Sequence, residues 1–68
     1  MYGVSEQEMI SMALKTAVQY EQAIALKYEE LAKTITDPAI QKHLQALEQT
    51  ARNHLNLLTQ KSQGLGIQ

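Results

Sequence analysis

The chain has no cysteine, tryptophan or phenylalanine, and it has one proline and three glycines among its 68 residues. Without cysteine it forms neither a disulfide nor a thiolate metal site, and it has no thiol nucleophile. With three tyrosines as its aromatic residues, its core must be built from Leu, Ile, Ala and Met. A chain this short rarely buries enough apolar surface alone, so we expect it to oligomerise.

Charge and hydropathy exclude further classes. Six Lys and Arg against seven Asp and Glu give a net charge of −1, so we expect no binding to nucleic-acid phosphates. No apolar run approaches the roughly 20 residues of a membrane span. The segment MYGVSEQEM is acidic and polar, unlike a secretion signal, so we expect a cytoplasmic protein. No Ser-His-acid set or Gly-rich phosphate loop supports a hydrolase or kinase.

Local signals predict two helices in one domain, residues 1–68. Ser5 and Glu8 have the spacing of a capping box, and Val4 and Met9 that of a hydrophobic staple, so a helix is predicted over about 6–35. The turn is expected at 36–37. Asp37 and Pro38 suit the N-cap and first turn of a second helix, over about 38–63. Gly64 is expected to end it in a left-handed cap, before a short tail.

Two helices joined by so short a turn must form an antiparallel hairpin. A 4-3 spacing predicts an apolar seam on each helix, interrupted by Glu21 on the first and by His54 on the second. The wide apolar faces would stay half exposed on a lone hairpin, so we expect a two-fold homodimer that closes a four-helix bundle. The predicted seams are Ile10, Leu14, Ala17, Glu21, Ile24, Tyr28, Leu31 and Ile35, and Ile40, Leu44, Leu47, Ala51, His54, Leu58 and Lys61.

The two polar interruptions fall at one level of the hairpin. With the turn near residue 36 or 37, antiparallel pairing places Glu21 opposite residues 51–53, next to His54. Because an uncompensated buried charge is costly, we expect Glu21 and His54 to meet in the bundle interior.

At these residues the chain resembles half of a ferritin or rubrerythrin. In that superfamily an inward Glu is followed seven residues later by a Tyr, as Glu21 and Tyr28 are here. The next helix carries Glu-x-x-His, which corresponds to the segment from Ala51 to His54. The resemblance implies a ferritin-like bundle with a di-iron centre, but Ala51 stands where the family has a ligand Glu. A complete ferroxidase site is therefore not expected.

A dimer would supply two copies of Glu21 and two of His54, a set that suits one zinc or one iron ion. Tyr28 is expected beside these ligands. The alternative is a structural or interaction protein without metal, in which the polar pair fixes register and partner choice. The sequence around Thr36-Asp37-Pro38 is also similar to that of the short coat-F-like proteins of spore formers. This resemblance implies an association with spores.

Overall fold

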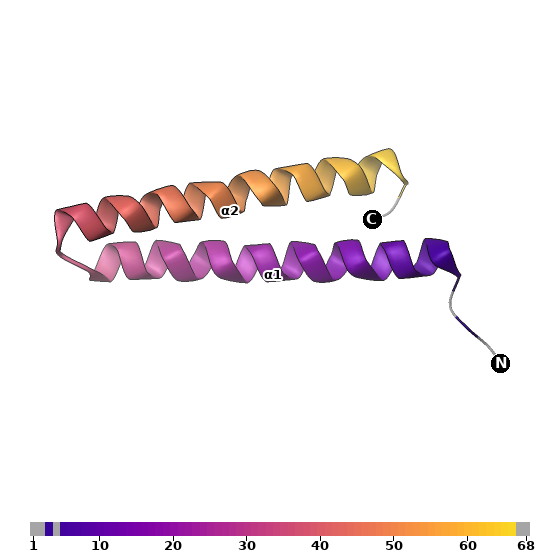
Figure 1. The fold of residues 1–68 in the computed structure, drawn as a ribbon, viewed down its shortest axis with the longest axis horizontal. Coiled ribbons are helices and arrows are strands. Elements are labelled where there is room, and N and C mark those ends of the chain that lie inside the picture. The colour runs from indigo at the N-terminus through magenta and orange to yellow at the C-terminus, as the bar shows by residue number, and fades with distance from the viewer. Residues whose placement is uncertain (1–2, 4, 67–68) are drawn as a thin grey trace.

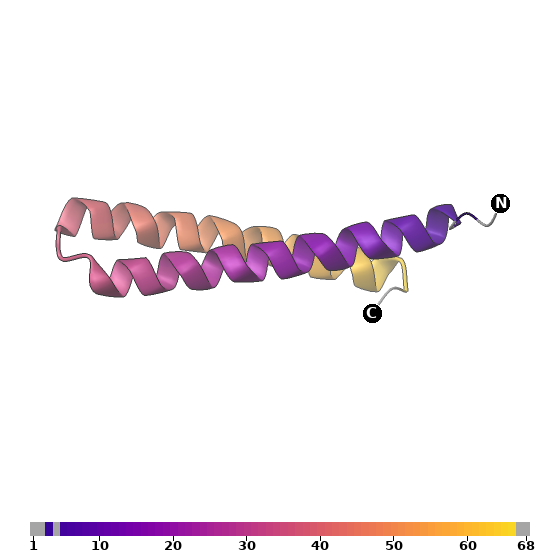
Figure 2. The same ribbon diagram turned by 90° about the horizontal axis from the view of Figure 1, so that it is seen from below.

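The computed structural model describes residue 3 and residues 5–66, and over this range it consists of two helices and no strand. Helix α1 spans Glu6–Thr34 and helix α2 spans Pro38–Gly64. The two helices pack against each other as a hairpin, 54 Å in its longest dimension (Figure 1). Figure 2 shows that they cross at a shallow angle. The predicted all-α hairpin is confirmed.

One of the two hydrogen bonds of the predicted capping box is present at the start of α1. The Ser5 hydroxyl oxygen accepts a hydrogen bond from the Glu8 backbone N–H at 3.1 Å. The second hydrogen bond differs from that of a capping box. The Glu8 carboxylate accepts it from the Ser5 hydroxyl, at 3.2 Å, rather than from a backbone N–H. Val4, the other member of the proposed staple with Met9, lies outside the described residues.

The turn is fixed by side chains of α2. Ile35 has an extended backbone, so α1 ends at Thr34. The Asp37 carboxylate caps α2 by accepting the backbone N–H groups of Ala39 and Ile40 at 3.0 Å each, as the sequence predicts. The Gln41 amide then reaches back to the end of α1 and donates to the carbonyl oxygens of Ala32 and Ile35, at 2.8 and 3.3 Å.

The end of α2 differs from the prediction. Gly64 is helical, and α2 includes it. The left-handed conformation falls two residues later, at Gly66, with φ of 73°. The Leu65 backbone N–H still bonds the Lys61 carbonyl at 3.1 Å, because a backbone that continues past Gly64 keeps the helical geometry.

Alanines are the buried residues of the seam along which the helices meet. Among the described residues, only Ala25, Ala32 and Ala51 are buried, with 1%, 5% and 3% of their surface exposed. No large side chain in the described part of the chain is fully buried. The half-buried seam residues around these alanines are Ser11, Leu14, Val18, Glu21 and Tyr28 on α1, Ile35 just after it, and Gln41, Leu44, Glu48, Leu55, Leu58 and Ser62 on α2.

The observed seam shares every second residue with the predicted seam. At the positions between, it uses the next residue along the chain. Leu14, Glu21 and Tyr28 belong to both, but Val18, Ala25 and Ala32 replace the predicted Ala17, Ile24 and Leu31. On α2, Glu48 and Leu55 replace Leu47 and His54. The physical reason is the width of the apolar face, which offers two neighbouring stripes. The stripe with alanines allows the helix axes to approach more closely and make more van der Waals contact.

We expect Asp37→Ala to lower the free energy of unfolding by about 1 kcal/mol per chain, because two N–H groups of α2 lose their acceptor. Asp37→Asn is the matched control, because it keeps the acceptor oxygen. Urea denaturation followed by circular dichroism measures both variants. Equal losses for Ala and Asn would show that the capping hydrogen bonds do not stabilise the hairpin.

Candidate functional site

The seam divides the hairpin surface into two flanks of opposite character. We define the polar flank by the residues that directly follow every second seam position, namely Leu14, Glu21 and Tyr28 on α1 and Leu44, Ala51 and Leu58 on α2. None of these six residues is apolar: they are Lys15, Gln22, Glu29, Gln45, Arg52 and Thr59. Two observations show that the polar-flank residues of α1 and those of α2 lie on the same side of the hairpin. The Arg52 guanidinium contacts the Glu29 carboxylate across the seam at 3.5 Å, and a shallow depression is lined by Gln22, Leu26, Arg52 and Leu55.

The apolar flank lies on the other side of the seam. We define it by the residues that directly precede the alternate set of seam positions, which is Ser11, Val18, Ala25 and Ala32 on α1 and Gln41, Glu48, Leu55 and Ser62 on α2. The residues of the apolar flank are Ile10, Ala17, Ile24 and Leu31 of α1 and Ile40, Leu47, His54 and Lys61 of α2. Six of these eight residues are apolar, against none of six on the polar flank, so the hairpin has one face suited to burial. Ile10 and Ile40 are 36% and 49% exposed, and Ile24, Leu31 and Leu47 are half-buried.

Glu21 and His54 meet at the apolar flank, as the sequence predicts. The Glu21 Oε1 atom lies 3.4 Å from His54 Nδ1, and the two residues come from different helices. Glu21 stands near the middle of α1, and His54 near the middle of α2. The pair is therefore a polar interruption halfway along an otherwise apolar face.

The burial of the two partners differs from the prediction. The Glu21 side chain lies in the seam and is 22% exposed, whereas the His54 side chain stands on the flank and is 55% exposed. His54 is therefore not in the interior of the hairpin itself, because Leu55 occupies the inward position of that turn. A contact with this much solvent exposure contributes little to the stability of a single chain.

Tyr28 and Ala51 lie in the helix contact, on the same helices as Glu21 and His54 respectively. Tyr28 is half-buried in the seam two turns beyond Glu21, and Ala51 is buried one turn before His54. Ala51 is 3% exposed in the contact between the helices, so it contributes packing there, and its methyl group offers no oxygen ligand.

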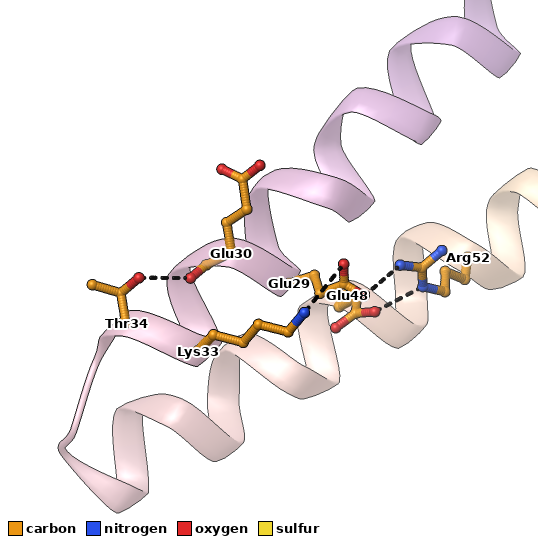
Figure 3. A network of polar contacts seen from close by, with 6 residues as sticks. All are labelled: Glu29, Glu30, Lys33, Thr34, Glu48 and Arg52. Carbon is orange, nitrogen blue, oxygen red and sulfur yellow. Dashed lines mark hydrogen bonds and ion pairs between the residues drawn. The ribbon is translucent and has the colours of Figure 1, made fainter.

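A polar network on the polar flank includes a residue that sequence reasoning placed wrongly. The predicted seam of the second helix passes through Leu47 and omits Glu48, but Glu48 occupies the seam position, with 20% of its side chain exposed. Its carboxylate accepts from Arg52 Nε at 2.8 Å, and Arg52 also contacts Glu29, which pairs with Lys33 at 3.9 Å (Figure 3). The i, i+4 spacing of Glu48 and Arg52 is the signal that reveals this pair.

The donor set within one chain is small. Over residue 3 and residues 5–66, no three His, Asp or Glu side chains come together in a group that could hold a metal ion. Glu21 and His54 offer one oxygen and one nitrogen donor, and Glu48 is engaged by Arg52 on the other side of the seam. A metal site of three or more protein ligands therefore needs donors from a second chain.

Neither helix of the described residues carries a stretch long and apolar enough to cross a bilayer. Comparison of the chain with protein-family models, with curated proteins and with solved structures gives no match.

Proposed function

We propose that this chain is a self-assembling helical hairpin, which pairs with a second copy through its apolar flank to form a four-helix bundle. The observation that carries the proposal is the contrast between the two flanks. Six apolar residues gather on one side of the seam, and charged and amide side chains line the other side. A contiguous apolar surface on a small protein marks an interface, and two-fold homodimers are the commonest closed assembly.

The exposed area supports a partner of the same size. A folded monomer of 7.6 kDa exposes about 4,300 Å² on the usual scaling of surface with mass. The hairpin exposes 5380 Å², an excess of roughly 1,100 Å². Stable protein interfaces remove about 800 Å² from each partner. One additional hairpin over the apolar flank accounts for the excess.

The core also favours assembly. Three buried alanines supply little apolar burial, since the burial of one large aliphatic side chain is worth about 1.5–3 kcal/mol and alanine much less. Ile24, Leu31 and Leu47 are half-buried on the flank and would become core residues against a second copy. The bundle thus obtains from its partner the large-residue core that the hairpin lacks.

Light scattering of the purified chain should give about twice the 7.6 kDa chain mass. Ile24→Lys and Leu47→Lys should each weaken the dimer by at least about 100-fold, because a two-fold interface contains each substitution twice. The thermal midpoint of the wild type should rise with protein concentration, since folding and association are linked.

The matched controls carry the same charge change on the polar flank, two residues away along each helix. Gln22→Lys and Gln45→Lys should leave the dimer mass unchanged. A wild-type chain that scatters as a monomer, with a midpoint independent of concentration, would overturn the proposal. Equal weakening by the flank variants and their controls would show that the interface lies elsewhere.

A second candidate function, a metal site shared by two chains, rests on the 3.4 Å contact between Glu21 and His54. Two copies of this pair supply two carboxylates and two imidazoles, which is the mixed N and O donor set that zinc and ferrous iron accept. The ferritin-like resemblance supports the same residues, with Tyr28 as their neighbour. Because Ala51 supplies no ligand, the proposed site holds one metal ion rather than a di-iron centre, and no ferroxidase activity is proposed.

Metal titration separates this site from a purely structural pair. We expect Zn²⁺ to bind at one ion per two chains in isothermal titration calorimetry, and Glu21→Gln and His54→Gln to abolish that binding. His43→Gln is the matched control, because His43 is the other histidine and is exposed elsewhere on α2. Dimeric wild-type protein that binds neither Zn²⁺ nor Fe²⁺ would contradict the metal site and leave a structural or interaction protein, with spore association as one setting.

A further inference from the structure

The apolar flank admits two symmetric pairings, and this inference about them rests on the dimer proposed above. A two-fold axis along the helices brings both turns to the same end and lays α1 over the partner's α2. A two-fold axis across the helices puts the turns at opposite ends and lays α1 over the partner's α1. The position of each polar residue along the hairpin distinguishes the two pairings.

The carboxylate of Glu21 disfavours the pairing with turns at opposite ends. Glu21 lies near the middle of α1, which spans Glu6–Thr34. When the middle of α1 crosses the middle of the partner's α1, Glu21 faces the partner's Glu21 inside an apolar interface. Two like charges that are close together and desolvated repel strongly, and neither gains a partner of opposite sign.

The pairing with turns at the same end instead satisfies both polar side chains. It keeps each residue at its own height along the bundle, and Glu21 and His54 already share one height, as their 3.4 Å contact shows. With α1 over the partner's α2, Glu21 therefore lies near the partner's His54 as well as its own. An imidazole can donate to a carboxylate from either chain, so the like-charge contact is replaced by complementary ones.

The apolar residues of the flank favour the same pairing. Leu31 and Ile40 lie near the turn. Ile24 and Leu47 each lie seven residues further from the turn along their own helix. With turns at the same end, each of these two pairs meets its own copy and forms a layer of large aliphatic side chains.

Lys61 supports this assignment at the other end of the bundle. It is exposed, in the last turn of α2, at the height of Ile10 on α1. With turns at the same end, both copies of Lys61 stand at the open end of the bundle, where their ammonium groups reach water. With turns at opposite ends, Lys61 lies over the aliphatic part of the partner's flank, on the turn side of His54, and covers an apolar side chain with a charged one.

We infer that two hairpins pair with their turns at the same end, so that two copies of Glu21 and two of His54 form one polar layer at mid-length, closed only by the second chain. Two layers of aliphatic residues lie between this layer and the turns. The polar layer specifies orientation, because rotation of one hairpin end over end replaces the contact of Glu21 with the partner's His54 by a contact with the partner's Glu21.

Pulsed electron–electron double resonance tests the orientation, because the chain has no native cysteine. Thr36→Cys, exposed in the turn, carries one nitroxide per chain. Turns at the same end give a separation of about 20–30 Å, since packed helices lie 8–10 Å apart and the labels add their own length. Turns at opposite ends give about 40 Å or more, since the 29 residues of α1 rise about 1.5 Å each.

A mixed sample provides the matched control. A donor dye on Thr36→Cys chains and an acceptor on Gln63→Cys chains, near the open end, form a pair chosen for a Förster distance well below the roughly 40 Å rise of the 27 residues of α2. Mixed dimers should then show little energy transfer. Efficient transfer, together with a long nitroxide separation in a dimer of confirmed mass, would overturn the orientation and leave the dimer standing. A monomer by light scattering with no dipolar coupling would overturn both.

Discussion

The close approach of two helices along small side chains is the constraint on which the rest of the structure depends. Ala25, Ala32 and Ala51 are the buried residues of the described chain, and each lies in the seam. Small residues at the contact bring the helix axes near each other and leave no room for a large side chain at those three positions. Ile24, Leu31 and Leu47, which stand directly beside seam positions, therefore lie on one flank, where a single chain covers them only in part.

This placement gives the hairpin two different sides. On the polar flank, Arg52 joins Glu48 of its own helix to Glu29 of the other helix. These side chains are well solvated, so the network adds little stability but keeps that side soluble. On the apolar flank, the aliphatic rows of α1 and α2 lie side by side. The same seam thus determines which surface is available for a partner.

The chemistry of the candidate site follows from its place on this surface. Glu21 and His54 meet in the middle of the apolar flank, with one carboxylate and one imidazole per chain. In a lone hairpin the pair is partly solvated and has too few donors to enclose a ligand. In the proposed dimer, a second apolar flank would exclude water from the pair, and only there would it have the donors and the surroundings to hold a metal ion or to specify orientation.

Local chemistry made most of the helix boundaries predictable from the sequence. Ser5 and Asp37 cap the helices through hydrogen bonds within three residues of themselves, so their effect needs no tertiary information. The level of Glu21 and His54 was also predictable, because helical rise and a short turn fix which residues face each other. The end of α2 was not, because a glycine permits a left-handed turn without requiring one, and Gly66 rather than Gly64 adopts it.

The tertiary structure alone decided which stripe of a wide apolar face forms the seam. The sequence offered two stripes that share Leu14, Glu21 and Tyr28, and hydropathy favoured the one with larger residues. Packing selected the stripe with alanines, since close backbone contact is gained only when both helices are in place. That choice moved Glu48 inward and His54 outward, and it left the larger side chains at the surface.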